Sequence, residues 1–149
     1  MKTQIVKTSS AEETTKLAAD ILTRLRPGDC LALTGDLGSG KTTFVKGLAD
    51  ALGVKGPVTS PTFLILKTYP TKDPAIKRLV HVDAYRLESA DDLVEVGFSD
   101  EINEPGTAAV VEWAEKVKDA LPASKTIWIK IKIGQKDDRI FEITWPNGR

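Results

Sequence analysis

The part of the chain that most constrains its fold is the segment 31–53, which combines an apolar run, a glycine-rich turn and an amphipathic helix pattern. Within it, Gly35, Gly40, Lys41 and Thr42 match the spacing G-x-x-x-x-G-K-[ST], which is typical of a loop that binds nucleotide phosphates. The inward-turned backbone N–H groups of such a loop and the positive end of the following helix together attract anions. The sequence therefore predicts a phosphate-binding loop, and a strand-to-helix turn that binds nothing is the less favoured alternative.

Each residue type in this loop has a chemical reason to be there. Gly38 and Gly40 lack a side chain, so the backbone can approach phosphate oxygens closely and adopt positive φ. We expect Lys41 to reach the terminal phosphates of the nucleotide and the Thr42 hydroxyl to ligate Mg²⁺. The predicted nucleotide-binding residues of the loop are Asp36, Leu37, Gly38, Ser39, Gly40, Lys41, Thr42 and Thr43.

The hydrophobic pattern predicts an α/β fold in a single domain, residues 1–149. Strands are expected over residues 3–8, 29–34, 63–69, 79–83, 107–112, 127–133 and 141–145, helices over 10–25, 41–52, 89–93 and 113–120, and irregular structure over 97–106. The run 30–33 is apolar throughout, as in a central parallel strand, and the alternation of Ile127, Ile129, Ile131 and Ile133 predicts one buried face. We predict a three-layer fold like that of P-loop NTPases, with a mixed, mainly parallel sheet and a C-terminal antiparallel hairpin.

Composition narrows the functional classes. The 21 basic and 21 acidic side chains give a formal net charge of zero, so the bulk charge offers none of the basic footprint that strong unaided nucleic-acid binding requires; a local basic patch is the alternative. Cys30 is the single cysteine, which excludes an internal disulfide and a cysteine zinc site and predicts a buried small side chain. Neither an apolar run of about 20 residues nor the apolar core of a secretory signal occurs, so we expect a cytoplasmic protein with no membrane contact.

Two carboxylates follow apolar runs and are candidates for a metal site. Asp83 ends the run LVHVD and Glu112 ends TAAVVE, so both would stand at the carboxyl edge of a parallel sheet, where open α/β folds bind ligands. A nucleotide–Mg²⁺ site needs such a group to hold the metal ion or its water shell. For each residue, the alternative is that its side chain only caps the helix that follows.

Several neighbouring side chains admit two interpretations. His81 alternates with Asp83 and shares its face; it could order a water, or be a satisfied, partly buried ring, which we favour. Tyr85 and Arg86 could support the site or a partner surface, and Arg86 could instead pair with a nearby carboxylate or offset phosphate charge. Trp113 could flank the nucleotide or simply pack in the core.

The motifs GDLGSGKTTFVKG, TSPTF, HVDAYRL and VVEW occur in this order and spacing between about residues 34 and 113. In this respect the chain resembles the bacterial TsaE family, which supplies the small ATPase for making threonylcarbamoyladenosine in tRNA. The resemblance implies Mg²⁺-dependent ATP hydrolysis and the protein partners TsaD and TsaB, with tRNA reached through their complex. The use of ATP that this resemblance implies agrees with the absence of the Asn-Lys-x-Asp motif that recognises guanine.

The resemblance also implies roles for individual residues. Thr42 and Glu112 would lie near Mg²⁺, and Asp83 would be essential to turnover, either by orienting the attacking water or by completing the metal shell. Lys41 and Asp83 are therefore the predicted catalytic residues, and Thr42, Asp83 and Glu112 the predicted metal ligands.

The segment TSPTF is similar to the nucleotide-sensing loop of that family. Thr59, Ser60 and Thr62 could close over the γ-phosphate and relax after hydrolysis, and Thr62 joins Trp113 among the predicted nucleotide contacts. A turn stiffened by proline is the alternative.

Two other functions remain open. A small-molecule kinase would share the loop and use Asp83 as the base on an acceptor hydroxyl, but kinases of this size usually need an arginine-rich lid, and only six arginines are present. A nucleotide-gated binding module would bind ATP without hydrolysing it. Because no arginine finger is evident in the chain itself, we expect slow hydrolysis by the isolated protein.

Overall fold

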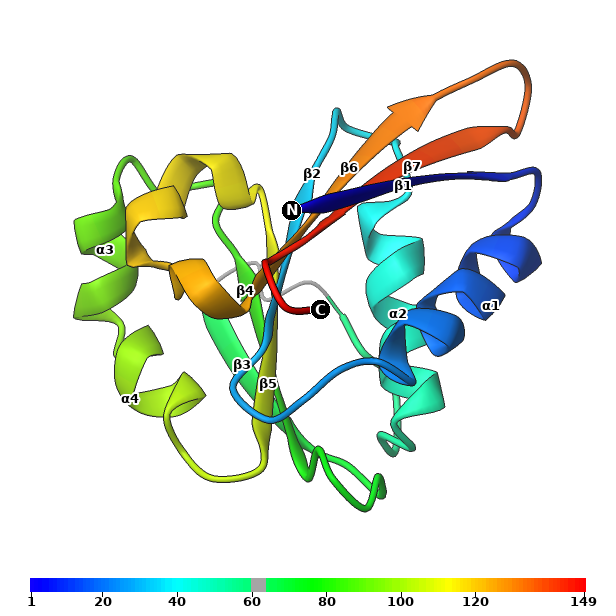
Figure 1. Ribbon diagram of the computed structural model, residues 1–149. Coiled ribbons are helices and arrows are strands. Elements are labelled where there is room, and N and C mark those ends of the chain that lie inside the picture. Colours follow the sequence, from blue (N-terminus) through cyan, green and yellow to red (C-terminus); the bar gives the residue numbers. More distant parts are fainter. Residues whose placement is uncertain (60–63) are drawn as a thin grey trace.

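The computed structural model describes residues 1–59 and 64–149, whose strands form one seven-stranded sheet in the order β1-β7-β6-β2-β5-β4-β3 (Figure 1). The strands are β1 (Lys2–Thr8), β2 (Cys30–Thr34), β3 (Leu66–Pro70), β4 (Arg78–Asp83), β5 (Thr107–Glu112), β6 (Thr126–Ile133) and β7 (Arg139–Trp145). The α-helices are α1 (Ala11–Leu22), α2 (Lys41–Ala51), α3 (Ala90–Glu95) and α4 (Phe98–Ile102), and two 3₁₀ helices, η1 (Ala114–Ala120) and η2 (Ala123–Lys125), precede β6.

The sheet is mixed, as predicted. Its central strands β6, β2, β5 and β4 run parallel, whereas β7 pairs antiparallel with both β6 and β1, and β3 pairs antiparallel with β4. The parallel arrangement brings the carboxyl ends of β2, β4 and β5 to one edge, where the glycine-rich loop also begins.

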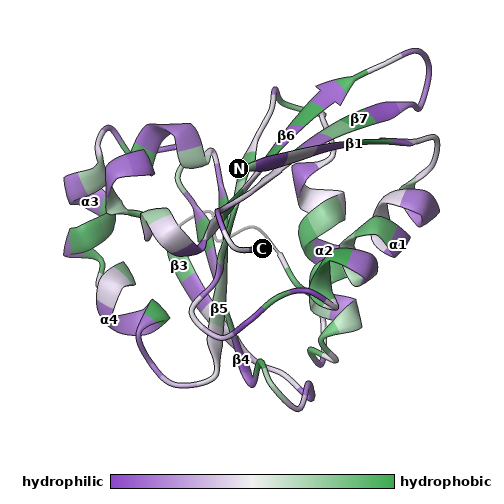
Figure 2. Ribbon diagram, viewed as in Figure 1, coloured by the Kyte–Doolittle hydropathy of each residue, from purple (hydrophilic) through white to green (hydrophobic). Residues whose placement is uncertain are grey.

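Helices cover both faces of the sheet and give the predicted three layers (Figure 1). On one face, α1 and α2 pack on side chains that include Leu31 and Leu33 of β2; on the other, α3, α4 and η1 pack on Cys30 and Ala32. These four β2 residues are at most 1% exposed, which confirms that this strand is buried on both faces. Figure 2 shows that α1 and α2 each combine hydrophobic with hydrophilic residues, as expected of helices with one face on the sheet.

The C-terminal hairpin forms as predicted, with one exception on its buried face. Ile127, Ile129 and Ile131 of β6 are at most 2% exposed, but Ile133 is 51% exposed. The difference arises because the tip of the hairpin projects past the layer formed by α1 and α2 (Figure 1). Alternation therefore predicted the facing of Ile133 but not the extent of the helical layer.

Two predicted segments differ in the structure. Residues 97–106, expected to be irregular, contain α4, because Gly97 adopts a φ of 87° and the buried Phe98 and Ile102 are one helical turn apart. The expected helix over 113–120 is the 3₁₀ helix η1, which starts after Trp113 at a φ of 58°. In addition, the strand predicted over residues 63–69 is β3, which begins at Leu66; residue 63 of the predicted segment lies outside the described part of the chain.

A buried ion pair ties the C-terminal residue to the start of β2. The guanidinium of Arg149 donates from Nη1 to Oδ1 of Asp29 at 2.9 Å and from Nη2 to Oδ2 at 2.6 Å, and Asp29 is 1% exposed. The same guanidinium donates to the carbonyl of Arg24 at 2.8 Å. This bidentate pair joins the end of α1, the start of β2 and the end of the chain.

Candidate nucleotide-binding site

The loop between β2 and α2 has a backbone that requires glycine. Gly35, Gly38 and Gly40 adopt φ values of 149°, 78° and 105°. A Cβ atom added at Gly35 would lie 2.7 Å from the carbonyl oxygen of Ile131 and 2.7 Å from Oγ of Ser39. The first turn of α2 has no side-chain cap at Gly40, so its backbone N–H groups are available to an anion.

Lys41 lies at the centre of the loop. Its ammonium donates hydrogen bonds to the carbonyl of Gly35, to the carbonyl of Asp36 at 2.9 Å and to Oγ of Ser39 at 3.4 Å. It also lies 4.2 Å from the centre of the Trp113 ring, which stabilises the cation through its π face. Burial lowers the pKa of Lys41, and the negative charge of Glu112 opposes this shift.

Glu112 connects the loop to the sheet. The Thr42 hydroxyl donates to Oε1 of Glu112 at 3.5 Å, and Nε2 of His81 lies 2.7 Å from Oε2. The side chains of His81 and Glu112 are 1% and 4% exposed. Asp83 stands opposite Glu112 in the β4–β5 register and accepts a hydrogen bond from the backbone N–H of Tyr85 at 3.1 Å. The two strand-end carboxylates are therefore adjacent, and both line the cavity that contains the loop.

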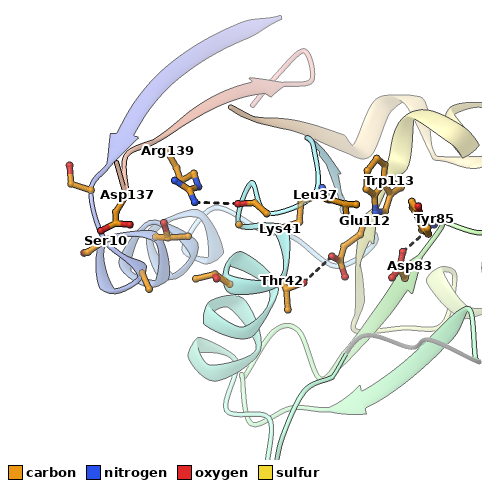
Figure 3. A pocket seen from close by; sticks show the side chains of 16 residues that line it. Ser10, Leu37, Lys41, Thr42, Asp83, Tyr85, Glu112, Trp113, Asp137 and Arg139 are labelled. Carbon is orange, nitrogen blue, oxygen red and sulfur yellow. Dashed lines mark hydrogen bonds between the residues drawn. The ribbon is translucent and has the colours of Figure 1, made fainter. Parts of the chain in front are cut away.

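The cavity has a volume of about 680 Å³, which suits a nucleotide-sized ligand (Figure 3). The predicted site residues that line it are Leu37, Gly38, Gly40, Lys41, Thr42, Thr43, Asp83, Glu112 and Trp113. Asp36 and Ser39 are not on the cavity wall; they hold the Lys41 ammonium instead. Of the proposed sensing loop, Thr59 is exposed, whereas Ser60 and Thr62 lie outside the described residues.

Sequence reasoning missed one end of this cavity. Ser9, Ser10, Ala11, Thr14, Asp137 and Arg139 line it, and they come from the start of α1 and from the turn between β6 and β7. Arg139 donates from Nη2 to the carbonyl of Gly38 at 3.2 Å, so the hairpin contacts the loop directly (Figure 3). Ser10 is the N-cap of α1, and its side chain accepts a hydrogen bond from the backbone N–H of Glu13 at 3.1 Å.

The structure shows the surroundings of His81, Tyr85, Arg86 and Trp113, for which the sequence allowed two roles each. His81 is more deeply buried than expected, at 1% exposure, and it contacts the Glu112 carboxylate. The rings of Tyr85 and Trp113 pack with their centres 5.0 Å apart, and Tyr85 is 48% exposed at the cavity mouth. Arg86 is exposed and is not among the described residues that line the cavity.

The donors at this edge suit Mg²⁺ bound together with phosphates. Within residues 1–59 and 64–149, no group of three or more His, Cys, Asp and Glu side chains is arranged to hold a metal ion by itself. Mg²⁺ in nucleotide sites, however, usually takes one or two carboxylates and completes its shell with water and phosphate oxygens. The oxygen donors of Thr42 and Glu112, with Asp83 beside them, match that requirement.

The fold and the loop together define a class of protein. A glycine-rich loop joins a buried parallel strand to an uncapped helix, with a buried lysine at its centre and carboxylates at the ends of two neighbouring strands. This is the arrangement of an α/β protein with the P-loop fold.

Comparison with known proteins identifies the family within this class. The family model "Threonylcarbamoyl adenosine biosynthesis protein TsaE" matches residues 8–141, and the chain belongs to the TsaE family, which is involved in tRNA threonylcarbamoyladenosine biosynthesis.

Individual relatives agree with this assignment. The tRNA threonylcarbamoyladenosine biosynthesis protein TsaE of Bacillus subtilis (strain 168) is 39% identical over 143 residues, which cover 96% of this chain and 86% of that protein. Its counterpart of the same name in Streptomyces coelicolor is 40% identical over 126 residues, or 80% of each chain. A solved structure, "Crystal structure of Bacillus subtilus YdiB", has a TM-score of 0.80 at 33% sequence identity and covers 99% of this chain and 88% of that chain. None of the helices in the described residues is long and apolar enough to cross a membrane.

Proposed function

We propose that this protein is a Mg²⁺-dependent ATPase that supports threonylcarbamoyladenosine modification of tRNA by acting on a complex of TsaD and TsaB. The observation that most supports ATP hydrolysis is the contact between the Thr42 hydroxyl and the Glu112 carboxylate, 3.5 Å apart, beside the buried Lys41. This contact brings a loop hydroxyl and a strand-end carboxylate together where a phosphate-bound metal ion needs its protein ligands.

The loop would bind the triphosphate through groups that are already positioned. The N–H groups at the start of α2 would face the phosphates, and the Lys41 ammonium would exchange its bonds to the Gly35 and Asp36 carbonyls for bonds to phosphate oxygens. When bound, Mg²⁺ would neutralise charge on the phosphate oxygens. Thr42 and Glu112 would hold that ion directly or through its water.

Asp83 would act on a water, either the attacking one or one bound to the metal ion. Its carboxylate stands opposite Glu112, lines the cavity and is fixed by the backbone N–H of Tyr85 through one oxygen. The other oxygen would accept a hydrogen bond from a water beside the γ-phosphate or from a water on the metal ion.

We place the adenosine portion at the opposite end of the cavity. Figure 3 shows Ser10, Asp137 and Arg139 on the side of Lys41 away from Asp83. Polar groups on a recessed wall suit a ribose and a base edge, and Arg139 is itself held by the Gly38 carbonyl. Because this arginine lies on the side of Lys41 away from Asp83, we do not assign it the role of an arginine finger, and the isolated chain should hydrolyse ATP slowly (Figure 3).

The proposed partners follow from the family and agree with the surface. A chain with no net charge is better suited to reaching tRNA through other proteins than to binding it alone. Leu37, at the tip of the loop, is 73% exposed and Tyr85, at the cavity mouth, is 48% exposed. Apolar side chains beside the phosphate end of the cavity suit contact with a protein that responds to the bound nucleotide.

Phosphate release from ATP, measured with the chain alone and with TsaD and TsaB added, tests this function. We expect Mg²⁺-dependent release that is slow alone and faster with the partners. Faster transfer of phosphate to a nucleoside or sugar than to water would instead identify a kinase. ATP binding without any hydrolysis, even with both partners present, would identify a non-enzymatic module.

A further inference from the structure

A histidine and a glutamate form a buried pair in a part of the sheet that is otherwise apolar. His81 lies on β4 between Val80 and Val82, both fully buried, and its ring meets Glu112 on the neighbouring strand. Buried polar groups of this kind are costly unless they are hydrogen-bonded, so their presence calls for a role beyond packing.

The chemistry of the two side chains determines which one donates the hydrogen bond. An ionised carboxylate only accepts hydrogen bonds, so Nε2 of His81 is the donor to Oε2 of Glu112, at 2.7 Å. Among the described residues, Nδ1 of His81 has no hydrogen-bond partner. The bond to Nε2 therefore holds the ring, and it holds one oxygen of the glutamate in return.

Holding one oxygen of Glu112 directs the other. With Oε2 bound to His81, Oε1 faces the Thr42 hydroxyl at 3.5 Å. Because Oε2 is bonded to the imidazole, Oε1 is the oxygen that is left to face the loop.

We propose that His81 is a positioning residue that keeps Oε1 of Glu112 directed at the metal ion of the nucleotide site. This inference rests on the proposed function, because it assigns a role to His81 only if Glu112 serves a nucleotide-bound Mg²⁺. Groups that orient metal-binding side chains typically raise metal affinity by roughly 10- to 100-fold, and we expect a contribution of this size from His81.

Substitutions of His81 separate positioning from packing. In His81→Gln, the side-chain amide can place an N–H close to the position of Nε2, so the bond to Glu112 is kept. In His81→Asn the shorter side chain cannot reach that position, and in His81→Leu the donor is absent. The matched control is Val80→Ala, which leaves a cavity in the same strand on its opposite face and does not touch Glu112.

The experiment measures Mn²⁺, used as a spectroscopic probe of the Mg²⁺ site, by electron paramagnetic resonance with the β,γ-imido analogue of ATP bound. We expect wild type, His81→Gln and Val80→Ala to bind Mn²⁺ within about threefold of one another, and His81→Asn and His81→Leu to bind roughly 10- to 100-fold more weakly. Affinity for the analogue in EDTA should be the same in all five proteins. If His81→Leu does not fold, the Mn²⁺ affinities of His81→Gln and His81→Asn alone decide whether the hydrogen bond to Glu112 is required.

Three outcomes overturn the proposal, and they differ from one another. Unchanged Mn²⁺ affinity in both His81→Asn and His81→Leu would remove the role of His81 and leave the ATPase function intact. An equal loss in Val80→Ala would show that general packing of β4 is responsible. Failure of wild-type protein with bound analogue to bind Mn²⁺ at all would overturn the metal-dependent function itself, and this inference with it.

Discussion

Thr42 and Glu112 are 70 positions apart in the chain, yet the hydroxyl of one lies 3.5 Å from the carboxylate of the other. The contact joins the first turn of α2 to the end of β5, and it forms because β2 and β5 are parallel neighbours in the sheet.

Replacement of Thr42 by alanine should leave ATP binding in EDTA unchanged and weaken Mg²⁺-supported binding at least about tenfold. Thr42→Ser keeps the hydroxyl and should retain most of the wild-type metal dependence, as measured by calorimetry with and without Mg²⁺; equal loss in both variants would contradict the role.

Lys41→Ala should weaken ATP binding by roughly 10- to 100-fold, because hydrogen bonds from a cation to phosphate are among the stronger ones. Lys46→Ala removes an exposed lysine from the same helix and is the matched control. Both affinities can be measured with a fluorescent ATP analogue. Equal affinity in the two variants would remove Lys41 from the phosphate site.

Asp83→Asn should preserve ATP binding and lower the rate of hydrolysis by about 10²- to 10⁴-fold, the usual range for a group that handles a proton or orients water. Mn²⁺ affinity of the nucleotide complex then separates the two roles of Asp83. Unchanged metal affinity assigns the residue to the attacking water, and a loss of tenfold or more assigns it to the metal shell. Wild-type turnover in Asp83→Asn would exclude both roles.

Arg139→Ala should weaken ATP binding roughly 3- to 10-fold and leave the turnover rate at saturating ATP unchanged, because this arginine contacts the loop at the end of the cavity away from Asp83. Lys136→Gln removes a positive charge from the same turn without touching the loop. A fall in the saturated rate, with affinity unaltered, would place Arg139 among the groups that act on the transferring phosphate.

Arg149→Ala should lower the free energy of unfolding by about 3–5 kcal/mol, because it leaves the Asp29 carboxylate buried without its cation. Urea denaturation of the pure protein measures this quantity. The double variant Asp29→Asn with Arg149→Ala removes the stranded charge and should be more stable than Arg149→Ala alone. If the two variants unfold at the same urea concentration, the pair contributes through packing and not through charge.

The position of the glycine-rich loop and of the helix that follows it could be predicted from the sequence, because the residues involved are close in the chain and each has a local reason for its type. The loop 35–40 needs glycines and a following helix, and both can be read without knowing the rest of the fold. The location of Asp83 and Glu112 at one edge of the sheet could also be predicted, since each ends an apolar run; their direct register opposite one another could not.

The other end of the cavity could not be predicted, because it depends on long-range strand pairing. Ser10 and Arg139 line the same cavity as the loop only after β1 has paired with β7 and β7 with β6. The left-handed backbone of Trp113 was equally hidden, since a tryptophan after a core strand gives no local sign of positive φ. The depth of His81 was underestimated because its partner Glu112 lies on a different strand.

The pairing of β1 with β7 also determines when the cavity can be completed during synthesis on the ribosome. A nascent chain of about 120 residues already includes the glycine-rich loop and both strand-end carboxylates, but β6 and β7 have not yet been made. In such a chain β2 lacks one parallel neighbour, and the cavity lacks the wall that contains Arg139. Full nucleotide affinity should therefore be reached only after translation of the final hairpin, when β6 and Arg139 complete the sheet and the cavity wall.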